Sequence, residues 1–350
     1  MPEPVPKIEK VPESELVIVG PTIQQQTDEL RRRLNSPHIP TRNKALSDIH
    51  SFPNKHALYK EVLRSLDDPA TRENALYALS SMAGDDNNAQ RVAEAVPKVL
   101  QYIDDSNPNA RSLSIRFCGE HGNMETIGIL SDALPKSKNP MEIIRAIARP
   151  GNRRTVPILI EYLKHRDRKI RLAAGDALGK IGDQRAIVPL IERLNDADTI
   201  VRSNAAFALA GFGHMNGKVA GYKKIYPALA VLARDSKTAD AAIVSLGHLG
   251  DKRALGFLAG ICSDKSANMR YCAVTALGLL GDERAEPVLI RALSDRSGKI
   301  RLAAIDALEK CGTIKAVPHL QKIAEQNNSE GAAAKAAIGI IMRRAKPQID

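Results

Sequence analysis

The stretch TVPILIEYLKHRDRKIRLAAGDALGKIGD, residues 155–183, decides the fold because the chain repeats it as EPVLIRALSDRSGKIRLAAIDALEKCGT at residues 286–313. In the first copy the apolar residues between Val156 and Leu163 fall three and four positions apart, which is the spacing of one face of an α-helix. The same spacing resumes at Ile170 and continues to the end of the copy. Each copy is therefore predicted to form two amphipathic helices that pack as an antiparallel hairpin.

A glycine closes each copy, and these glycines mark the period of the repeat. They recur about every 31 residues from Gly182 to Gly312, with one longer interval between Gly213 and Gly250. Glycine readily adopts the left-handed conformation that ends a helix, and an aspartate after it caps the next helix. We expect this stop-and-cap function at three pairs: Gly182 and Asp183, Gly250 and Asp251, Gly281 and Asp282.

A single hairpin exposes an apolar face that it cannot cover alone, so neighbouring hairpins must stack. The sequence therefore predicts an all-α fold, an α-solenoid (superhelix) of about ten helical hairpins. We expect one solenoid over residues 23–350, preceded by an extended, flexible tail at 1–22 that carries five prolines. Within the solenoid we expect degenerate repeats at 23–92, regular repeats at 93–313 and a capping repeat at 314–346.

The units AIVPLIERLNDADTIVRSNAAFALAGFG (186–213) and KIRLAAGDALGKIGD (169–183) resemble HEAT-like repeats. The resemblance is to the short kind, with about 30 residues per repeat, that occurs in phycobilin lyases and in many prokaryotic helical scaffolds. It covers residues 93–345 well and 24–92 more loosely. The resemblance implies a protein that holds partner macromolecules, and it brings in a bilin-lyase-like enzyme as one alternative.

Basic residues are concentrated in the second half of the chain. The net charge is +11, but residues 1–152 carry −1 and residues 153–350 carry +12. Equivalent loops of stacked hairpins share one edge, so we expect the groups at 164–169 and 296–299 to lie along the same edge. The candidate partner-binding residues are Lys164, Arg166, Arg168, Lys169, Lys223, Lys224, Arg296 and Lys299.

An arginine recurs at one position of the second helix of the repeat, at Arg72, Arg111, Arg171, Arg202, Arg270 and Arg301. One interpretation is a row of phosphate contacts along a groove. The other, favoured by the resemblance, is a structural ladder in which each arginine pairs with an acid of an interhelix loop. The acids considered for this ladder are Asp104, Asp198, Asp264 and Asp295.

The sequence lacks the common catalytic motifs. There is no GxxxxGK[ST] loop, no GxSxG elbow and no HExxH pair, and the four cysteines align with core positions of the repeat. We therefore predict no enzyme activity, no catalytic or metal-binding residues and no cofactor.

Three functions remain open at this point. The leading hypothesis is a non-enzymatic scaffold or adaptor that binds a partner protein with an acidic surface through its helical face or its basic loop edge. The second is a nucleic-acid-binding protein. Only Tyr222, Tyr226 and Tyr271 are expected as exposed aromatics in the basic half, which is few for stacking on the bases of a single strand. The expected ligand is therefore duplex DNA or structured RNA, bound through its phosphates. The third is the bilin-lyase-like enzyme.

The location of the protein follows from simple features of the sequence. No apolar run reaches the roughly 18 residues that a membrane span needs. The four scattered cysteines fit a reducing compartment, so we expect a cytoplasmic protein without a membrane span. The oligomeric state stays open.

Overall fold

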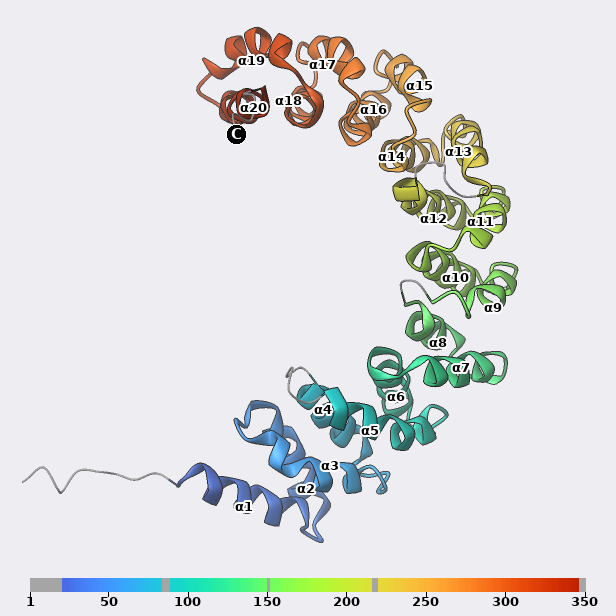
Figure 1. The fold of residues 1–350 in the computed structure, drawn as a ribbon, viewed down its shortest axis with the longest axis vertical. Helices are drawn as coiled ribbons and strands as arrows, with labels where there is room; N and C mark the ends of the chain where they lie inside the picture. The colour runs from blue at the N-terminus through green and yellow to red at the C-terminus, as the bar shows by residue number, and fades with distance from the viewer. Residues whose placement is uncertain (1–20, 84–88, 150–151, 216–219, 346–350) are drawn as a thin grey trace, which may run out of the picture. The chain divides into compact units, whose positions relative to one another are not determined.

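The computed structural model describes residues 21–83, 89–149, 152–215 and 220–345, and within these ranges every regular element is a helix (Figure 1). The prediction of an all-α solenoid is confirmed, because ten successive helical hairpins can be followed through the described residues. The expected tail at 1–22 lies outside the described residues except for Pro21 and Thr22.

The chain divides into two compact units, residues 1–126 and 127–350. The helices of the first unit are α1 (Ile23–Leu34), α2 (Ile39–Asp48), α3 (Tyr59–Ser65), α4 (Arg72–Ala83), α5 (Ala89–Val99) and α6 (Pro108–His121). Helix α7 (Met124–Ala133) contains the boundary between the units.

The second unit holds the regular repeats and the candidate site. Its remaining helices are α8 (Pro140–Ile147), α9 (Val156–Tyr162), α10 (Arg168–Ile181), α11 (Ile187–Arg193), α12 (Thr199–Ala210), α13 (Ile225–Leu232), α14 (Ala239–Leu249), α15 (Ala254–Ile261), α16 (Ala267–Leu280), α17 (Glu286–Ala292), α18 (Gly298–Cys311), α19 (Val317–Ala324) and α20 (Ser329–Ala345).

The hairpin of α9 and α10 shows why these residues fold as they do. Asp167 begins α10, and its carboxylate accepts a hydrogen bond of 2.8 Å from the backbone N–H of Lys169. Such a cap stabilises a helix by about 1 kcal/mol because it satisfies an N–H that has no partner within the helix. Leu159 belongs to the apolar face of α9, and Ala174 and Leu178 belong to that of α10. All three residues are fully buried between the helices and their neighbours.

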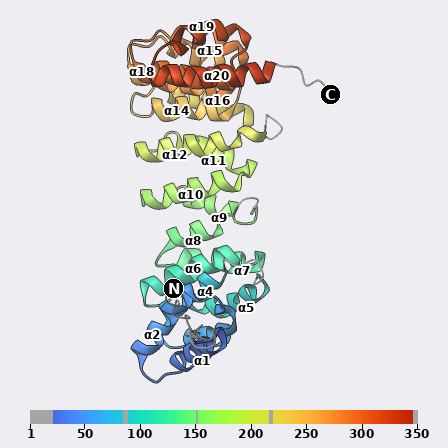
Figure 2. The ribbon, with the colours of Figure 1, turned by 90° about the vertical axis from the view of Figure 1, so that its left-hand side faces the viewer.

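In the second unit the first helices of the hairpins form one layer and the second helices form the other (Figure 1). The second helices from α8 to α20 pack one on the next; Figure 2 shows α10, α12 and α14 stacked, and Figure 1 shows α14, α16, α18 and α20 following one another. Small residues allow this close contact: a methyl group added at Gly278 of α16 would lie 2.8 Å from the Cα of Ala307 on α18. The second helices therefore form a continuous layer, with thin side chains where their axes approach.

The three stop-and-cap pairs lie at the turns between hairpins. Gly182, Gly250 and Gly281 have φ values of 67°, 69° and 67°, the left-handed conformation that glycine adopts without strain. Gly312 differs, because it ends α18 in an extended conformation with φ of −73°.

Candidate partner-binding surface

We call the edge of the second unit that carries the loops between first and second helices the loop edge. It comprises residues 163–167, 194–198, 233–238, 262–266 and 293–297, together with the first turns of the helices that follow them. Each loop leads into a second helix of the stacked layer, so the loops repeat along one side of the unit (Figure 2).

Most of the ladder arginines join their own loop to the next loop along the chain. Arg171 donates from Nη1 to the backbone oxygen of His165 in its own loop, at 2.9 Å. Its Nη2 donates to Oδ1 of Asp196 in the following loop, also at 2.9 Å. The same arrangement joins Arg72 to Asp105, Arg202 to Asp235, Arg270 to Asp295 and Arg301 to Glu330. The hydrogen bonds and ion pairs of these arginines therefore hold successive repeats together.

The structure changes part of the expected pairing. Asp295 does accept from Arg270, but Asp198 pairs with Arg168 at 3.2 Å rather than with a ladder arginine. The carboxylate of Asp264 accepts instead from the backbone N–H of Ser266, at 2.7 Å. Arg111 donates to the backbone oxygen of Asp105 at 2.6 Å.

The ladder leaves several cations of the loop edge without a carboxylate partner among the described residues. These side chains are exposed and belong to Lys164, Arg166, Lys169, Lys237, Lys265 and Arg296. Of the other residues expected here, Arg168 is paired with Asp198, and Lys299 lies over the ring of Tyr271 at 4.0 Å.

Lys223 and Lys224 are exposed but lie elsewhere. They belong to the short helix η8 (Tyr222–Lys224), which precedes α13 at the turn between hairpins. The backbone oxygen of Lys223 accepts from Arg253 at 3.4 Å, and Arg253 belongs to the next such turn. These two lysines therefore lie at the edge opposite to the loop edge, and the structure does not bring them together with Lys164 or Arg166.

The expectation of three exposed tyrosines in the basic half is wrong for Tyr222. Only 5% of this residue is exposed, and its hydroxyl donates to the backbone oxygen of Leu249 at 3.4 Å. Tyr226 is half-buried with the guanidinium of Arg253 5.2 Å from its ring centre. Stacking platforms for nucleic-acid bases are therefore scarcer than the sequence indicated.

The turns between hairpins contain an ion pair that the sequence interpretation missed. Asp183 receives three hydrogen bonds of 2.9 Å from Arg185, one from the backbone and two from the side chain. The Arg185 guanidinium therefore holds the pKa of Asp183 below its usual range. Asp282 is bound in the same way by Arg284, whose side-chain hydrogen bonds lower the pKa of Asp282 to about 2. The signal was present as Gly-Asp-x-Arg-Ala, at 182–186, 250–254 and 281–285.

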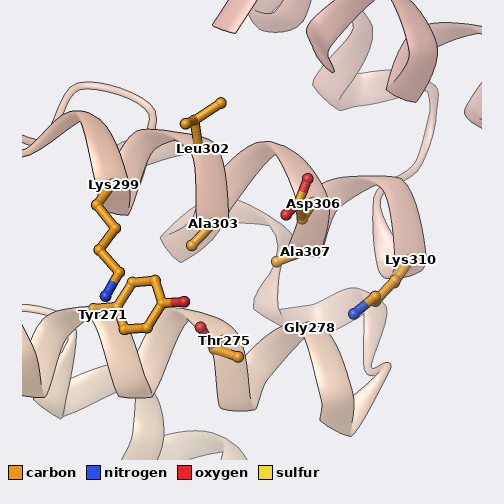
Figure 3. Close-up of a pocket in the computed structure, with 9 residues that line it drawn as sticks. All are labelled: Tyr271, Thr275, Gly278, Lys299, Leu302, Ala303, Asp306, Ala307 and Lys310. Carbon is orange, nitrogen blue, oxygen red and sulfur yellow. The ribbon is translucent and has the colours of Figure 1, made fainter. Parts of the chain in front are cut away.

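A groove of about 290 Å³ lies between the second helices α16 and α18 (Figure 3). Helix α16 contributes Tyr271, Thr275 and Gly278 to its lining, and α18 contributes Lys299, Leu302, Ala303, Asp306, Ala307 and Lys310. Figure 3 shows the two lysines at opposite ends of the groove, with the tyrosine ring and the threonine between them. Of this group, only Lys299 was among the candidate partner-binding residues predicted from the sequence, and Tyr271 was expected only as an exposed aromatic.

The cysteines are unsuited to nucleophilic chemistry. Cys118, Cys272 and Cys311 are buried, as their repeat positions predicted, and Cys262 is half-buried. Burial raises the pKa of Cys118 to about 12 and those of Cys262 and Cys311 to about 11. These thiols are therefore protonated near neutral pH.

The described residues contain neither a group of metal ligands nor a membrane-spanning helix. Among the residues that the structure describes, no three His, Cys, Asp or Glu side chains gather in a way that would hold a metal ion. No described helix is both long enough and apolar enough to cross a membrane.

The arrangement of stacked helical hairpins defines a helical-repeat protein. The family model for HEAT repeats matches residues 135–210, 187–270, 224–289 and 262–340, which together exceed half of the chain, and the protein belongs to this family. No curated protein sequence matches the chain.

Solved structures with the same fold include much longer proteins. Importin beta is 12% identical with a TM-score of 0.63, and the alignment covers 89% of this chain and 52% of that one. A mutant of Kap121p is 11% identical with a TM-score of 0.62, and the alignment covers 92% of this chain and 42% of that one. An engineered protein is 20% identical with a TM-score of 0.48, over 90% of this chain and 98% of that one. The chain thus spans about half or less of importin beta and of the Kap121p mutant, and the likeness concerns the fold.

Proposed function

We propose that the protein is a non-enzymatic scaffold that holds the acidic face of a partner protein on the loop edge of the second unit. The observation that supports this proposal is the distribution of charge along that edge. The ladder arginines and Arg168 neutralise Asp196, Asp198, Asp235 and Asp295, whereas exposed cations such as Lys164 and Arg166 have no carboxylate partner in the described part of the chain.

This distribution favours an interface in which the partner supplies the missing carboxylates. Bringing a positive edge and a negative face together raises the association rate and fixes the register of the complex. Each exposed ion pair contributes only about 0.2–1 kcal/mol, so a useful affinity requires several of them in a row. Repetition of the loops along one edge supplies such a row.

The test reverses three unpaired cations at once, Lys164→Glu, Arg166→Glu and Lys169→Glu. The matched control carries Lys252→Glu, Lys315→Glu and Lys322→Glu, which make the same change in net charge at exposed positions away from the loop edge. Proteins captured by the full chain and by both variants are compared by quantitative mass spectrometry. The captured proteins that are acidic are then titrated directly as purified partners.

We expect the loop-edge variant to lose its acidic partner at least about tenfold in affinity, while the control keeps it within about twofold. Equal capture and equal affinity for all three proteins would remove the loop edge from the proposed function.

Nucleic acid is the second candidate, because the same unpaired cations suit phosphates. Gel-shift titrations of duplex DNA and of a structured RNA at about 50 and 200 mM salt test it, since phosphate contacts weaken steeply over this range. Binding at low salt that disappears in the loop-edge variant and persists in the control would replace the protein partner with nucleic acid. No shift at low salt removes this candidate.

A further inference from the structure

The groove between α16 and α18 offers hydrogen-bond donors at intervals along its length. Lys299 and Lys310 are exposed, and neither has a carboxylate partner within the described residues. Tyr271 and Thr275 line the groove, and neither hydroxyl has a hydrogen-bond partner in the described part of the chain; the Thr275 hydroxyl is buried beneath the groove floor, which leaves the Tyr271 hydroxyl to face a ligand. An unpaired tyrosine hydroxyl between two unpaired ammonium groups favours a ligand that supplies acceptors.

The spacing of the two lysines limits what the ligand is. They are 11 residues apart on one helix, which places their backbones about 16 Å apart at 1.5 Å per residue. Figure 3 shows the ammonium of Lys310 turned back toward Gly278, which shortens the distance between the two charges. A single phosphate or carboxylate is too small to contact both lysines.

An extended peptide matches this distance. Its side chains i, i+2 and i+4 lie on one face, and residues i and i+4 are about 13 Å apart. Acidic side chains at i and i+4 then reach Lys299 and Lys310. The side chain at i+2 falls over the small apolar residues Ala303, Ala307 and Gly278, where the close approach of α16 and α18 leaves a shallow floor.

We propose that the groove between α16 and α18 binds an extended peptide segment of the pattern acid-x-apolar-x-acid, with Lys299 and Lys310 contacting the two acids and the apolar side chain seated between them. This inference deepens the scaffold function proposed above and rests on it, because it names a peptide site on the helical face in addition to the loop edge.

Two observations favour a peptide over other ligands. The groove volume of about 290 Å³ lies at the bottom of the roughly 300–1,000 Å³ typical of small-molecule sites, so side chains of a peptide that crosses it suit it better than an enclosed ligand. Asp306 lies between the two lysines along α18 and would repel a continuous row of phosphates. Acids four residues apart avoid it, because the residue between them is apolar.

The test uses fluorescein-labelled synthetic peptides and the full chain, followed by fluorescence anisotropy at about 50 mM salt. The probe is Ser-Glu-Ser-Leu-Ser-Glu-Ser. The first control peptide replaces both glutamates with glutamine, and the second, Ser-Ser-Glu-Leu-Glu-Ser-Ser, places the acids only two residues apart. We expect the probe to bind at least about fivefold more tightly than either control, as two exposed ion pairs imply.

The protein variants compare lysines inside and outside the groove. The double variant Lys299→Gln, Lys310→Gln removes both charges from the groove. The control Lys180→Gln, Lys322→Gln changes two exposed lysines that belong neither to the groove nor to the loop edge, and we call it the lysine control. A third variant, Asp306→Asn, removes the repelling carboxylate. We expect the groove variant to weaken probe binding at least about fivefold, the lysine control to leave it within about twofold, and Asp306→Asn to strengthen it. Circular dichroism melting verifies that each variant is folded.

Equal binding of the three peptides, or equal weakening by the groove variant and the lysine control, overturns the peptide site. The same holds if an oligo-dT strand binds in a Lys299- and Lys310-dependent manner and the probe does not. The loop-edge variant Lys164→Glu, Arg166→Glu, Lys169→Glu separates the two proposals. If it loses the acidic partner and keeps the probe, the loop edge and the groove are independent sites, as we propose. If the probe peptide does not bind while the loop-edge variant still loses the acidic partner, the peptide site in the groove is contradicted and the scaffold function is not.

Discussion

Helices α10 and α18 share the pattern KIRLAAxDALxK, at residues 169–180 and 299–310, and differ inside it only at two positions. Their surroundings differ much more. Lys299 lies over the ring of Tyr271 and lines the groove with α16, whereas no aromatic ring lies under Lys169 among the described residues. Asp176 of α10 accepts a hydrogen bond of 2.5 Å from Asn204 of the next second helix, and Asp306 has no such partner in the described residues.

This comparison separates what the repeat sequence determines from what its neighbours determine. The pattern places an arginine, an acid and two lysines at the same positions on both helices. Whether the lysine becomes part of a binding groove depends on the second helix before it, which is α16 for Lys299. Whether the aspartate has a hydrogen-bond donor depends on the second helix after it, which is α12 for Asp176. Four predictions test this division, in order of decreasing effect on stability.

The largest effect is expected from the ladder arginines. Arg301→Met leaves both oxygens of Glu330 without their partners, since Arg301 donates to them at 2.9 and 2.6 Å. Arg171→Met leaves Asp196 with Arg193, which lies 3.6 Å away. An unpaired buried carboxylate is costly, so we expect melting temperatures to fall by about 5 °C for Arg301→Met and by about half of that for Arg171→Met, as measured by circular dichroism. A larger fall for Arg171→Met would mean that burial, rather than the number of remaining partners, decides the cost.

The glycines that end the two helices come next. Gly182 after α10 needs a left-handed backbone, and a methyl group there meets only the ring edge of His214 at 3.9 Å. Gly312 after α18 has an ordinary backbone, but a methyl group would lie 2.5 Å from the backbone oxygen of Leu308. We expect alanine to lower the melting temperature by about 3 °C at either site.

Asparagine distinguishes the two causes, because it tolerates the left-handed conformation and is larger than alanine. Gly182→Asn should recover most of the loss, and Gly312→Asn should recover none. Recovery at both sites would show that the steric account of Gly312 is wrong.

The helix pairs and their period follow from the sequence, because apolar residues three and four apart and a closing glycine specify each hairpin locally. The stop at Gly182 and the cap at Asp183 follow in the same way. The partner of Arg171 does not follow from the sequence. Asp196 and Asp198 lie two residues apart in one loop, and only the packed structure shows which of them pairs with Arg171. The groove was missed for a similar reason: Tyr271 and Lys299 are 28 residues apart, and the repeat pattern does not place the ring under the ammonium.

The third prediction concerns the turns that follow α10 and α18, which differ in how their stability depends on pH. After α10, Asp183 is bound by Arg185, and its pKa lies below the usual 3.8. Its contribution to folding is therefore complete above about pH 4 and disappears as the pH falls below that value. After α18 the equivalent residue is Thr313, which carries no charge. We expect Asp183→Asn to lower the melting temperature by about 2 °C at pH 7, and we expect this loss to shrink as the pH falls below about 4.

The turn after α16 serves as a second copy for this measurement. The pKa of Asp282 is about 2, so the effect of Asp282→Asn should persist to lower pH than that of a carboxylate with an ordinary pKa. A difference between Asp183→Asn and the unaltered chain that stays constant from pH 7 to pH 2 would contradict the ion-pair account.

The smallest effect concerns the acid that the two helices share. Asp176→Ala removes the acceptor for the Asn204 amide, which is near the surface and can turn to water, so we expect a loss of about 1 °C in melting temperature. Asp306→Ala removes no hydrogen bond within the described residues and should leave the melting temperature unchanged. Because Asp306 lies beside the groove lysines, its removal should instead appear as tighter binding of the acidic peptide. A stability loss at Asp306 equal to that at Asp176 would mean that the carboxylate has the same structural role on both helices, and the division between repeat and neighbour would not hold at this position.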